Sequence, residues 1–166
     1  MAKSDLKHET LVAEQFGSRA AVYLASAVHA EGADLNRLAH LMRGQNEARV
    51  LDLGCGAGHV SFAVAPHVAE VVAYDLSAEM LETVTRAAAG RGLGNVRTER
   101  GVAESLPFPD TSFDAALSRY SAHHWRDLDA ALREVARVLK PGGLFAVADA
   151  ISPGSPLLDT HLQAIE

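Results

Sequence analysis

The sequence has few of the features of a secreted or membrane protein. Cys55 is its single cysteine, so no internal disulfide can form. No apolar run approaches the roughly 20 residues that a membrane helix needs. The polar start of the chain also lacks the apolar segment of a signal peptide. We therefore expect a cytoplasmic protein without a membrane span.

Positive charge is scarce as well. The chain has 15 Lys and Arg against 21 Asp and Glu, which gives a net charge of -6. No block of basic residues could neutralise a row of phosphates, and we expect no nucleic-acid partner. With 166 residues, 48% of them hydrophobic, the chain can bury one core and form a single domain.

Apolar patterning predicts strands that alternate with helices. Short apolar runs bounded by turn residues predict strands over residues 48–53, 70–74, 95–99, 113–118 and 144–148. Helical spacing predicts helices over 9–42, 59–67 and 77–89, and from Asp127 to the turn at 140–143. Ser77 is expected to cap its helix. This alternation is typical of a parallel sheet that is covered on both faces.

A glycine-rich loop follows the first predicted strand, with Gly54, Gly56 and Gly58 at alternate positions. Glycines let the backbone turn sharply and approach a ligand closely. In an open parallel sheet, ligands bind beyond the carboxyl ends of the strands. The dinucleotide fingerprint is G-x-G-x-x-G, and here His59 stands where its third glycine would be. The spacing disfavours a nicotinamide-dependent oxidoreductase, which is the competing enzyme class.

An acidic residue, Asp75, ends the second predicted strand about 20 residues after the glycine loop. A carboxylate at this interval can accept hydrogen bonds from both ribose hydroxyls of a nucleoside. The alternative is that the glycines only form a tight turn and Asp75 only caps the next helix. The combination of loop and acid favours a binding site.

Five ordered segments carry a family resemblance. They are VLDLGCGAGHVS (50–61), VVAYDLSAEML (71–81), AESLPFPDTSFD (103–114), SRYSAHHW (118–125) and LREVARVLKPGG (132–143). With these motifs the chain, from about Gln15 onward, resembles the class I S-adenosylmethionine-dependent methyltransferases. Within that class it resembles the ubiquinone and menaquinone biosynthesis group and related small-molecule methyltransferases.

The resemblance implies an α/β fold, a Rossmann-like doubly wound parallel sheet of strand order 3-2-1-4-5 with helices on both faces. Residues 1–47 would form a helical lid segment, and residues 48–166 would form the domain that binds S-adenosyl-L-methionine and its product S-adenosyl-L-homocysteine. The residues that the resemblance assigns to the cofactor are Asp52, Gly54, Cys55, Gly56, Asp75, Leu76, Met80, Ala103, Glu104 and Arg119.

The resemblance also suggests individual roles. Asp52 and the glycine loop would border the methionine moiety and Asp75 the ribose. Ala103 and Glu104 would border the adenine, and Arg119 would form the floor of the site. Many relatives have an aspartate where this chain has Val102, so the adenine amine must find another acceptor here.

The family's sheet normally continues beyond the fifth strand, whereas this chain ends at Glu166. We therefore expect a truncated protein or fragment without strands six and seven. Its fifth strand, residues 144–148, would then lie at the sheet edge with unpaired backbone groups. A second copy of the chain, giving a homo-oligomer, or a missing C-terminal piece is expected to pair with that edge.

The candidate catalytic residues follow the fourth predicted strand. His123 and His124, with Tyr120 before them, are candidates for a general base that takes a proton from the methyl acceptor. A structural role in the loop is the alternative. A third ligand at metal-binding spacing is missing, so we expect no metal site, and Cys55, between glycines, is not expected to be a nucleophile.

The resulting hypothesis is methyl transfer to a small, quinone-like or otherwise apolar molecule. The alternative is a catalytically incomplete fragment of such an enzyme that binds the cofactor or a partner chain.

Overall fold

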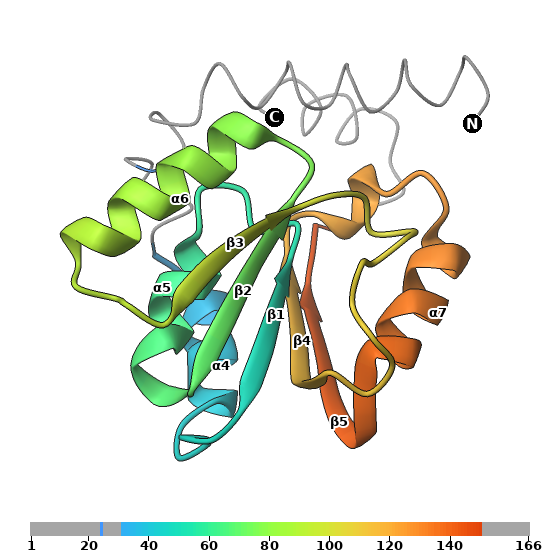
Figure 1. Cartoon of the computed structure of the whole chain (residues 1–166), viewed down its shortest axis with the longest axis horizontal. Coiled ribbons are helices and arrows are strands. Elements are labelled where there is room, and N and C mark those ends of the chain that lie inside the picture. Colours follow the sequence, from blue (N-terminus) through green and yellow to red (C-terminus); the bar gives the residue numbers. More distant parts are fainter. Residues whose placement is uncertain (1–23, 25–30, 151–166) are drawn as a thin grey trace.

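The computed structural model describes Leu24 and residues 31–150. None of the described helices is long and apolar enough to cross a lipid bilayer. The elements, in chain order, are α4 (Ala33–Leu41), β1 (Arg49–Leu53), α5 (His59–Val64), the 3-10 helix η1 (Ala65–His67), β2 (Glu70–Asp75), α6 (Ala78–Gly90), β3 (Val96–Arg100), β4 (Phe113–Arg119), the 3-10 helix η2 (Ala122–His124), α7 (Leu128–Val138) and β5 (Leu139–Ala148). Figure 1 shows their arrangement.

The five strands form one parallel sheet in the order β3-β2-β1-β4-β5. This confirms the expected fold and strand order. β1 lies in the middle, paired on one side with β2 and on the other with β4. The strand order therefore reverses at β1, because β2 and β3 lie on one side of it and β4 and β5 on the other. The carboxyl ends of β1, β2 and β4 lie at the same edge of the sheet (Figure 1).

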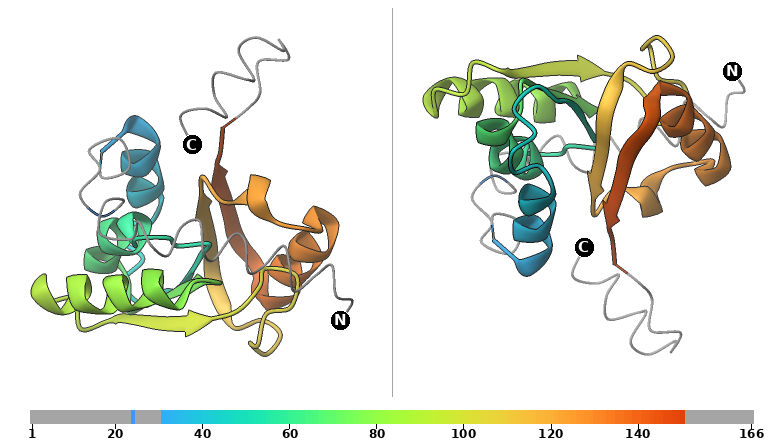
Figure 2. Two further views of the ribbon diagram at one scale, coloured as in Figure 1. Left: turned by 90° about the horizontal axis from the view of Figure 1, so that it is seen from above. Right: turned by 90° about the horizontal axis from the view of Figure 1, so that it is seen from below.

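Helices cover both faces of the sheet, as predicted. α4, α5 and α6 lie on one face and α7 lies on the other (Figures 1 and 2). Successive side chains of a strand point to opposite faces. Val50 of β1 accordingly packs with α4 and α5, whereas Leu51 and Leu53 pack with α7. All three are buried, so β1 is sequestered from water on both faces.

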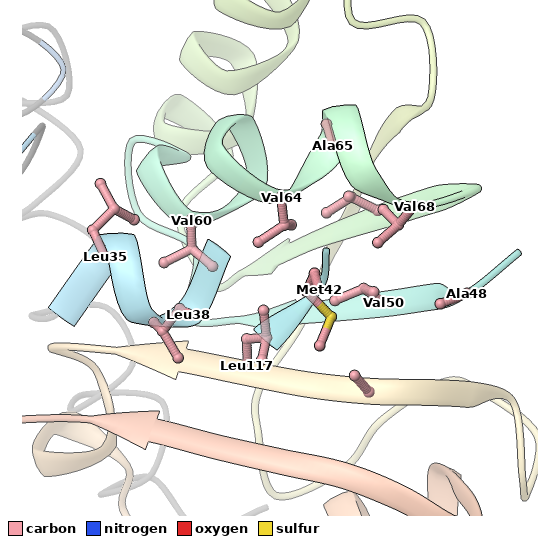
Figure 3. Close-up of a cluster of buried hydrophobic side chains, with 12 residues drawn as sticks. Leu35, Leu38, Met42, Ala48, Val50, Val60, Val64, Ala65, Val68 and Leu117 are labelled. Atoms are coloured by element: carbon pink, nitrogen blue, oxygen red, sulfur yellow. The ribbon is translucent and has the colours of Figure 1, made fainter. Parts of the chain in front are cut away.

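The core between α4, α5 and the sheet depends on helical periodicity. Leu35, Leu38 and Met42 recur at intervals of three and four residues and point toward α5 and the strands (Figure 3). They meet Val64 of α5 and Leu117 of β4, both completely buried. This cluster sets the height of α5 above the sheet and so positions the loop that precedes it.

Side chains cap the starts of α6 and α7; sequence analysis predicted the cap at Ser77, and it predicted Asp127 as the start of its helix. The Ser77 hydroxyl accepts a hydrogen bond from Met80 N at 3.3 Å at the start of α6. The Asp127 carboxylate accepts one from Ala130 N at 2.9 Å at the start of α7. In each case the side chain satisfies an N–H group that the first helical turn leaves without a partner.

The last strand begins earlier than predicted. Leu139 already pairs with Phe113 directly after α7, the register then shifts, and regular pairing resumes between Ala115 and Leu144. The predicted turn at 140–143 is therefore an irregularity within β5 rather than a separate connection. β5 is an edge strand of the described sheet, as expected, and Val147 on it is 45% exposed.

Replacing Leu117 by alanine is expected to destabilise the fold, because the truncation leaves a cavity between α4, α5 and the sheet. We expect Leu117→Ala to lower the free energy of unfolding by about 2–5 kcal/mol, measured by urea denaturation. The control is Leu128→Ala, at a side chain that is 50% exposed, for which we expect a loss below about 1 kcal/mol. Equal losses in the two variants would contradict this account of the core.

Candidate active site

The glycine loop between β1 and α5 makes the sharp turn that its sequence predicts. Gly54 N and Cys55 N both donate to the carbonyl oxygen of Tyr74, at 2.9 and 3.0 Å, which ties the loop to the end of β2. Gly58 N donates to Cys55 O at 2.9 Å, and Gly58 is the N-cap residue of α5. The loop is therefore anchored at both ends by backbone hydrogen bonds.

Two of the glycines are required for different reasons. A Cβ on Gly54 would lie 1.8 Å from the Ser121 hydroxyl oxygen, so close approach of the loop after β4 excludes a side chain there. Gly56 has a φ of +50°, and a Cβ on it would meet no atom of the described residues within 4 Å. Among the described residues, no atom therefore fills the space beside the Gly56 backbone.

Asp75, at the end of β2, joins this loop to α6. Its Oδ2 accepts from Gly56 N at 2.8 Å, and its Oδ1 accepts from Ser77 N at 2.9 Å. Burial raises the pKa of the Asp75 carboxyl, and the two backbone donors oppose that rise. The carboxyl group thus lies directly beside Gly56, and its bond from Ser77 N is also the capping contact of the alternative interpretation. Its contact with a ribose stays a prediction.

Asp52 is buried beneath the same loop. Its Oδ2 accepts from Ser61 N at 2.9 Å and from the Ser61 hydroxyl at 2.6 Å. Burial raises the pKa of Asp52 to about 7, Ser61 opposes the rise, and the charge of Asp75 adds to it. Sequence analysis did not single out Ser61. The available signal was a hydroxyl residue in the first turn after the glycine loop, where backbone N–H groups seek an acceptor.

Three further residues that the resemblance assigns to the cofactor are Cys55, Met80 and Leu76. Cys55 is buried, and this burial raises the pKa of its thiol well above the ordinary value, which agrees with its not being a nucleophile. Met80 of α6 is buried against Ala57. Leu76 is partly buried, and its carbonyl oxygen accepts from Arg100 Nε at 3.0 Å.

The residues assigned to the adenine lie between β3 and β4. Ala103 is buried in the core on the α7 face. Glu104 Oε1 accepts from the backbone N–H groups of Arg126 and Asp127, at 2.7 and 3.1 Å. The Glu104 side chain therefore holds the chain at the start of α7, and an adenine contact by either residue stays a prediction.

Arg119, the last residue of β4, is buried and points to α4. Its Nε donates to Asp34 Oδ2 at 2.5 Å and its Nη2 to Asp34 Oδ1 at 3.2 Å. Its guanidinium lies 4.6 Å from the ring centre of Tyr120. The hydrogen bond from Arg119 lowers the pKa of Asp34 below its ordinary value. Sequence analysis missed this link between β4 and α4, because the two residues are far apart in the chain.

The candidate catalytic residues gather just beyond β4. Tyr120 has a φ of +52°, and its N–H donates to Ala148 O at 2.9 Å, which joins the ends of β4 and β5. His123 and His124 lie in η2, with ring centres 3.9 Å apart. His123 Nδ1 lies 2.6 Å from Asp149 Oδ1. Sequence analysis did not foresee this contact.

Candidate metal ligands do not cluster in the described part of the chain. Within Leu24 and residues 31–150, no group of three or more His, Cys, Asp or Glu side chains could hold a metal ion. The polar groups near the glycine loop are hydrogen-bonded to backbone and hydroxyl groups instead.

Comparison with known proteins identifies the family. A family model described as "Methyltransferase domain" matches residues 51–147. The chain belongs to the methyltransferase domain family. The matched residues include all five strands from Leu51 of β1 to Val147 of β5, and thus the glycine loop, Asp75 and the two histidines.

Three curated relatives are similar to this chain, and two of them are named as methyltransferases. The chain is 56% identical over 113 residues to the "Uncharacterized protein YafE" of Escherichia coli, covering 68% of this chain and 55% of that protein. It is 46% identical over 144 residues to the "Uncharacterized methyltransferase YcgJ" of Bacillus subtilis, covering 87% of this chain and 57% of that protein. It is 40% identical over 116 residues to the "2-phytyl-1,4-naphtoquinone methyltransferase" of Synechococcus elongatus, covering 66% of this chain and 49% of that protein.

The solved structure of YcgJ from Bacillus subtilis is similar to this methyltransferase domain. The TM-score is 0.72 at 44% sequence identity, and the match covers 80% of this chain and 56% of that chain. The chain spans about half the length of the curated relatives that it matches.

The ionisation of Asp52 predicts a distinct pH dependence of stability. The pKa is 3.8 for an ordinary aspartate and about 7 in the folded chain. As pH rises through this interval the unfolded chain loses the proton first, so unfolding becomes easier. Asp52→Asn cannot ionise. We expect its unfolding free energy, relative to the unmodified chain, to rise from about pH 4 to 7 and then to level off.

The measurement is urea denaturation at a series of pH values, and the matched control is Asp129→Asn at an exposed position of α7. The control is expected to follow the unmodified chain. Parallel stability curves for Asp52→Asn and the unmodified chain would show that burial does not raise the pKa of Asp52.

Proposed function

We propose that this chain binds S-adenosyl-L-methionine at the glycine loop and transfers its methyl group to a small-molecule acceptor. The observation that carries the proposal is the open space at Gly56 with the Asp75 carboxyl group beside it. Membership of the methyltransferase domain family supports it. So does the relationship to a protein named as a methyltransferase of 2-phytyl-1,4-naphtoquinone.

The residues at the loop fit an adenosyl sulfonium. The space at Gly56 among the described residues leaves room for the donor, and Asp75 offers carboxylate oxygens to ribose hydroxyls. Asp52, whose pKa is about 7, adds negative potential near a cationic sulfur when its carboxyl group is ionised. When bound, the donor supplies an activated methyl group and a neutral thioether leaving group. The protein's contribution is to position the acceptor and to exclude water.

The acceptor is proposed to be small and quinone-like, on the strength of the names of the relatives. Residues 1–47 are proposed to close over it as a lid, and residues 48–166 to hold the donor. The net charge of -6 argues against a nucleic-acid acceptor. Cytoplasmic localisation stays part of the proposal. We also propose that the chain self-associates at β5. The exposure of Leu144 and Val147 at the sheet edge supports this proposal.

Binding is the first test of the proposal. We expect S-adenosyl-L-homocysteine to bind in the micromolar range by isothermal titration calorimetry and to raise the melting temperature. Asp75→Ala should abolish both effects, because it removes the carboxylate beside Gly56, while Asp129→Ala should keep them. Absence of binding to the unmodified chain would refute the proposal.

Transfer is the second test. The probe is S-adenosyl-L-methionine with 2-phytyl-1,4-naphthoquinol, and mass spectrometry detects a product that is one methyl group heavier. Transfer supports a methyltransferase of quinone-like acceptors. Binding of the donor without transfer would instead favour the alternative function, a cofactor-binding unit without turnover of this acceptor.

A glycine pair separates the binding role from the folding role of the loop. Gly56 and Gly44 both have positive φ, and a Cβ on either would meet no described atom within 4 Å. Alanine at either position should therefore cost about 1–2 kcal/mol of folding free energy. Only Gly56→Ala should weaken the binding of S-adenosyl-L-homocysteine, by at least about tenfold, because the methyl group of the new alanine enters the proposed ligand space.

The measurements are urea denaturation and calorimetric titration on both variants. Unchanged affinity in Gly56→Ala would show that the space at this glycine is not the binding site.

A further inference from the structure

β3 forms the edge of the described sheet opposite to β5 (Figure 1). It pairs with β2 on one side, and among the described residues no strand pairs with its other side. The backbone N–H and C=O groups along that side can therefore accept another strand. An edge strand pairs with other chains unless its side chains prevent the contact. The side chains of β3 therefore decide what can associate there.

The side chains of β3 alternate between the two faces of the sheet. The Thr98 hydroxyl oxygen lies 3.3 Å from that of Thr85 in α6, so Thr98 points to the α6 face. Arg97 and Glu99 therefore point to the other face, and both are exposed. Arg97 Nε lies 2.7 Å from Glu70 Oε1, yet the Arg97 side chain is 77% exposed. This face of β3 thus presents one positive and one negative charge, two residues apart.

Opposite charges at this spacing are complementary to themselves across a two-fold axis. In an antiparallel pair of β3 strands centred on Thr98, Arg97 of each copy lies directly opposite Glu99 of the other. Opposite charges that face each other across two strands stabilise the pair, whereas like charges destabilise it. A register shift of two residues would place Arg97 opposite Arg97 or Glu99 opposite Glu99. The two charges therefore select one register.

The groove between α6 and β3 lies beside the same axis. Its volume is about 290 Å³, and it is lined by Leu81, Glu82, Thr85, Arg86 and Thr98. Glu82 and Arg86 are exposed, and they lie on opposite sides of Thr85 along α6. A two-fold axis perpendicular to the sheet at Thr98 reverses α6, so Glu82 of one copy lies on the side of Arg86 of the other. The helix therefore repeats the charge complementarity of the strand.

We propose that two copies of this chain associate at β3, by antiparallel pairing of their β3 strands about a two-fold axis at Thr98. The two sheets then form one continuous sheet. Because the strands of the two copies run in opposite directions, their glycine loops lie at opposite edges of that sheet. The proposal does not depend on methyl transfer. It concerns the edge opposite to β5, so the two contacts can be tested separately.

The test is sedimentation velocity of the full chain at concentrations between about 1 and 100 μM. We expect the unmodified chain to associate as its concentration rises. Arg97→Glu and Glu99→Arg should each weaken association by at least about tenfold, because each substitution places like charges opposite each other in both cross-strand pairs. The matched control is Glu47→Arg at an exposed position outside β3, and it should associate like the unmodified chain. Urea denaturation first establishes that each variant folds.

An equimolar mixture of the two charge variants is the decisive measurement. The Arg97→Glu chain and the Glu99→Arg chain present opposite charges to each other in both cross-strand pairs, so the mixture should regain the association that each variant loses. Neither substitution lies on β5, so recovery on mixing reports the contact at β3. A monomeric unmodified chain, unaltered association in either variant, or no recovery in the mixture would overturn the proposal.

Discussion

The hydrogen bond between Gly56 N and the Asp75 carboxylate links the two parts of the sequence on which the site depends. It joins the loop after β1 to the end of β2, and the same carboxyl group accepts from Ser77 N at the start of α6. The link is possible because β1 and β2 are parallel neighbours whose carboxyl ends meet. The backbone at Gly56 and the carboxyl group beside it are thus one structural unit.

The core explains why this unit keeps its shape. Two side chains, Val50 and Leu117, are buried on one face of the sheet, and Leu51 and Leu53 are buried on the other. β1 is therefore held in place by packed side chains on both faces. The buried carboxyl group of Asp52 beneath the loop is compensated by hydrogen bonds from Ser61 of α5. The loop can therefore present an open backbone without losing its anchoring.

The other side of the site depends on the end of β4. Arg119 connects it to Asp34 of α4, while Tyr120 and His123 connect it to the end of β5 through Ala148 and Asp149. The strand order places these links opposite Asp75, across the end of β1. The candidate cofactor and catalytic residues thereby come from different strands of one sheet edge.

Local patterns were sufficient for the described elements except the start of β5, and for the glycine loop, because helix caps, periodicity and glycine spacing act over a few residues. Ser77, Asp127 and the position of Asp75 followed from them. The contacts of Asp52 with Ser61, Arg119 with Asp34, and His123 with Asp149 did not. The last two join residues 85 and 26 positions apart. Strand pairing and the burial of α4 decide them, since only the packed sheet brings such distant side chains within hydrogen-bonding distance.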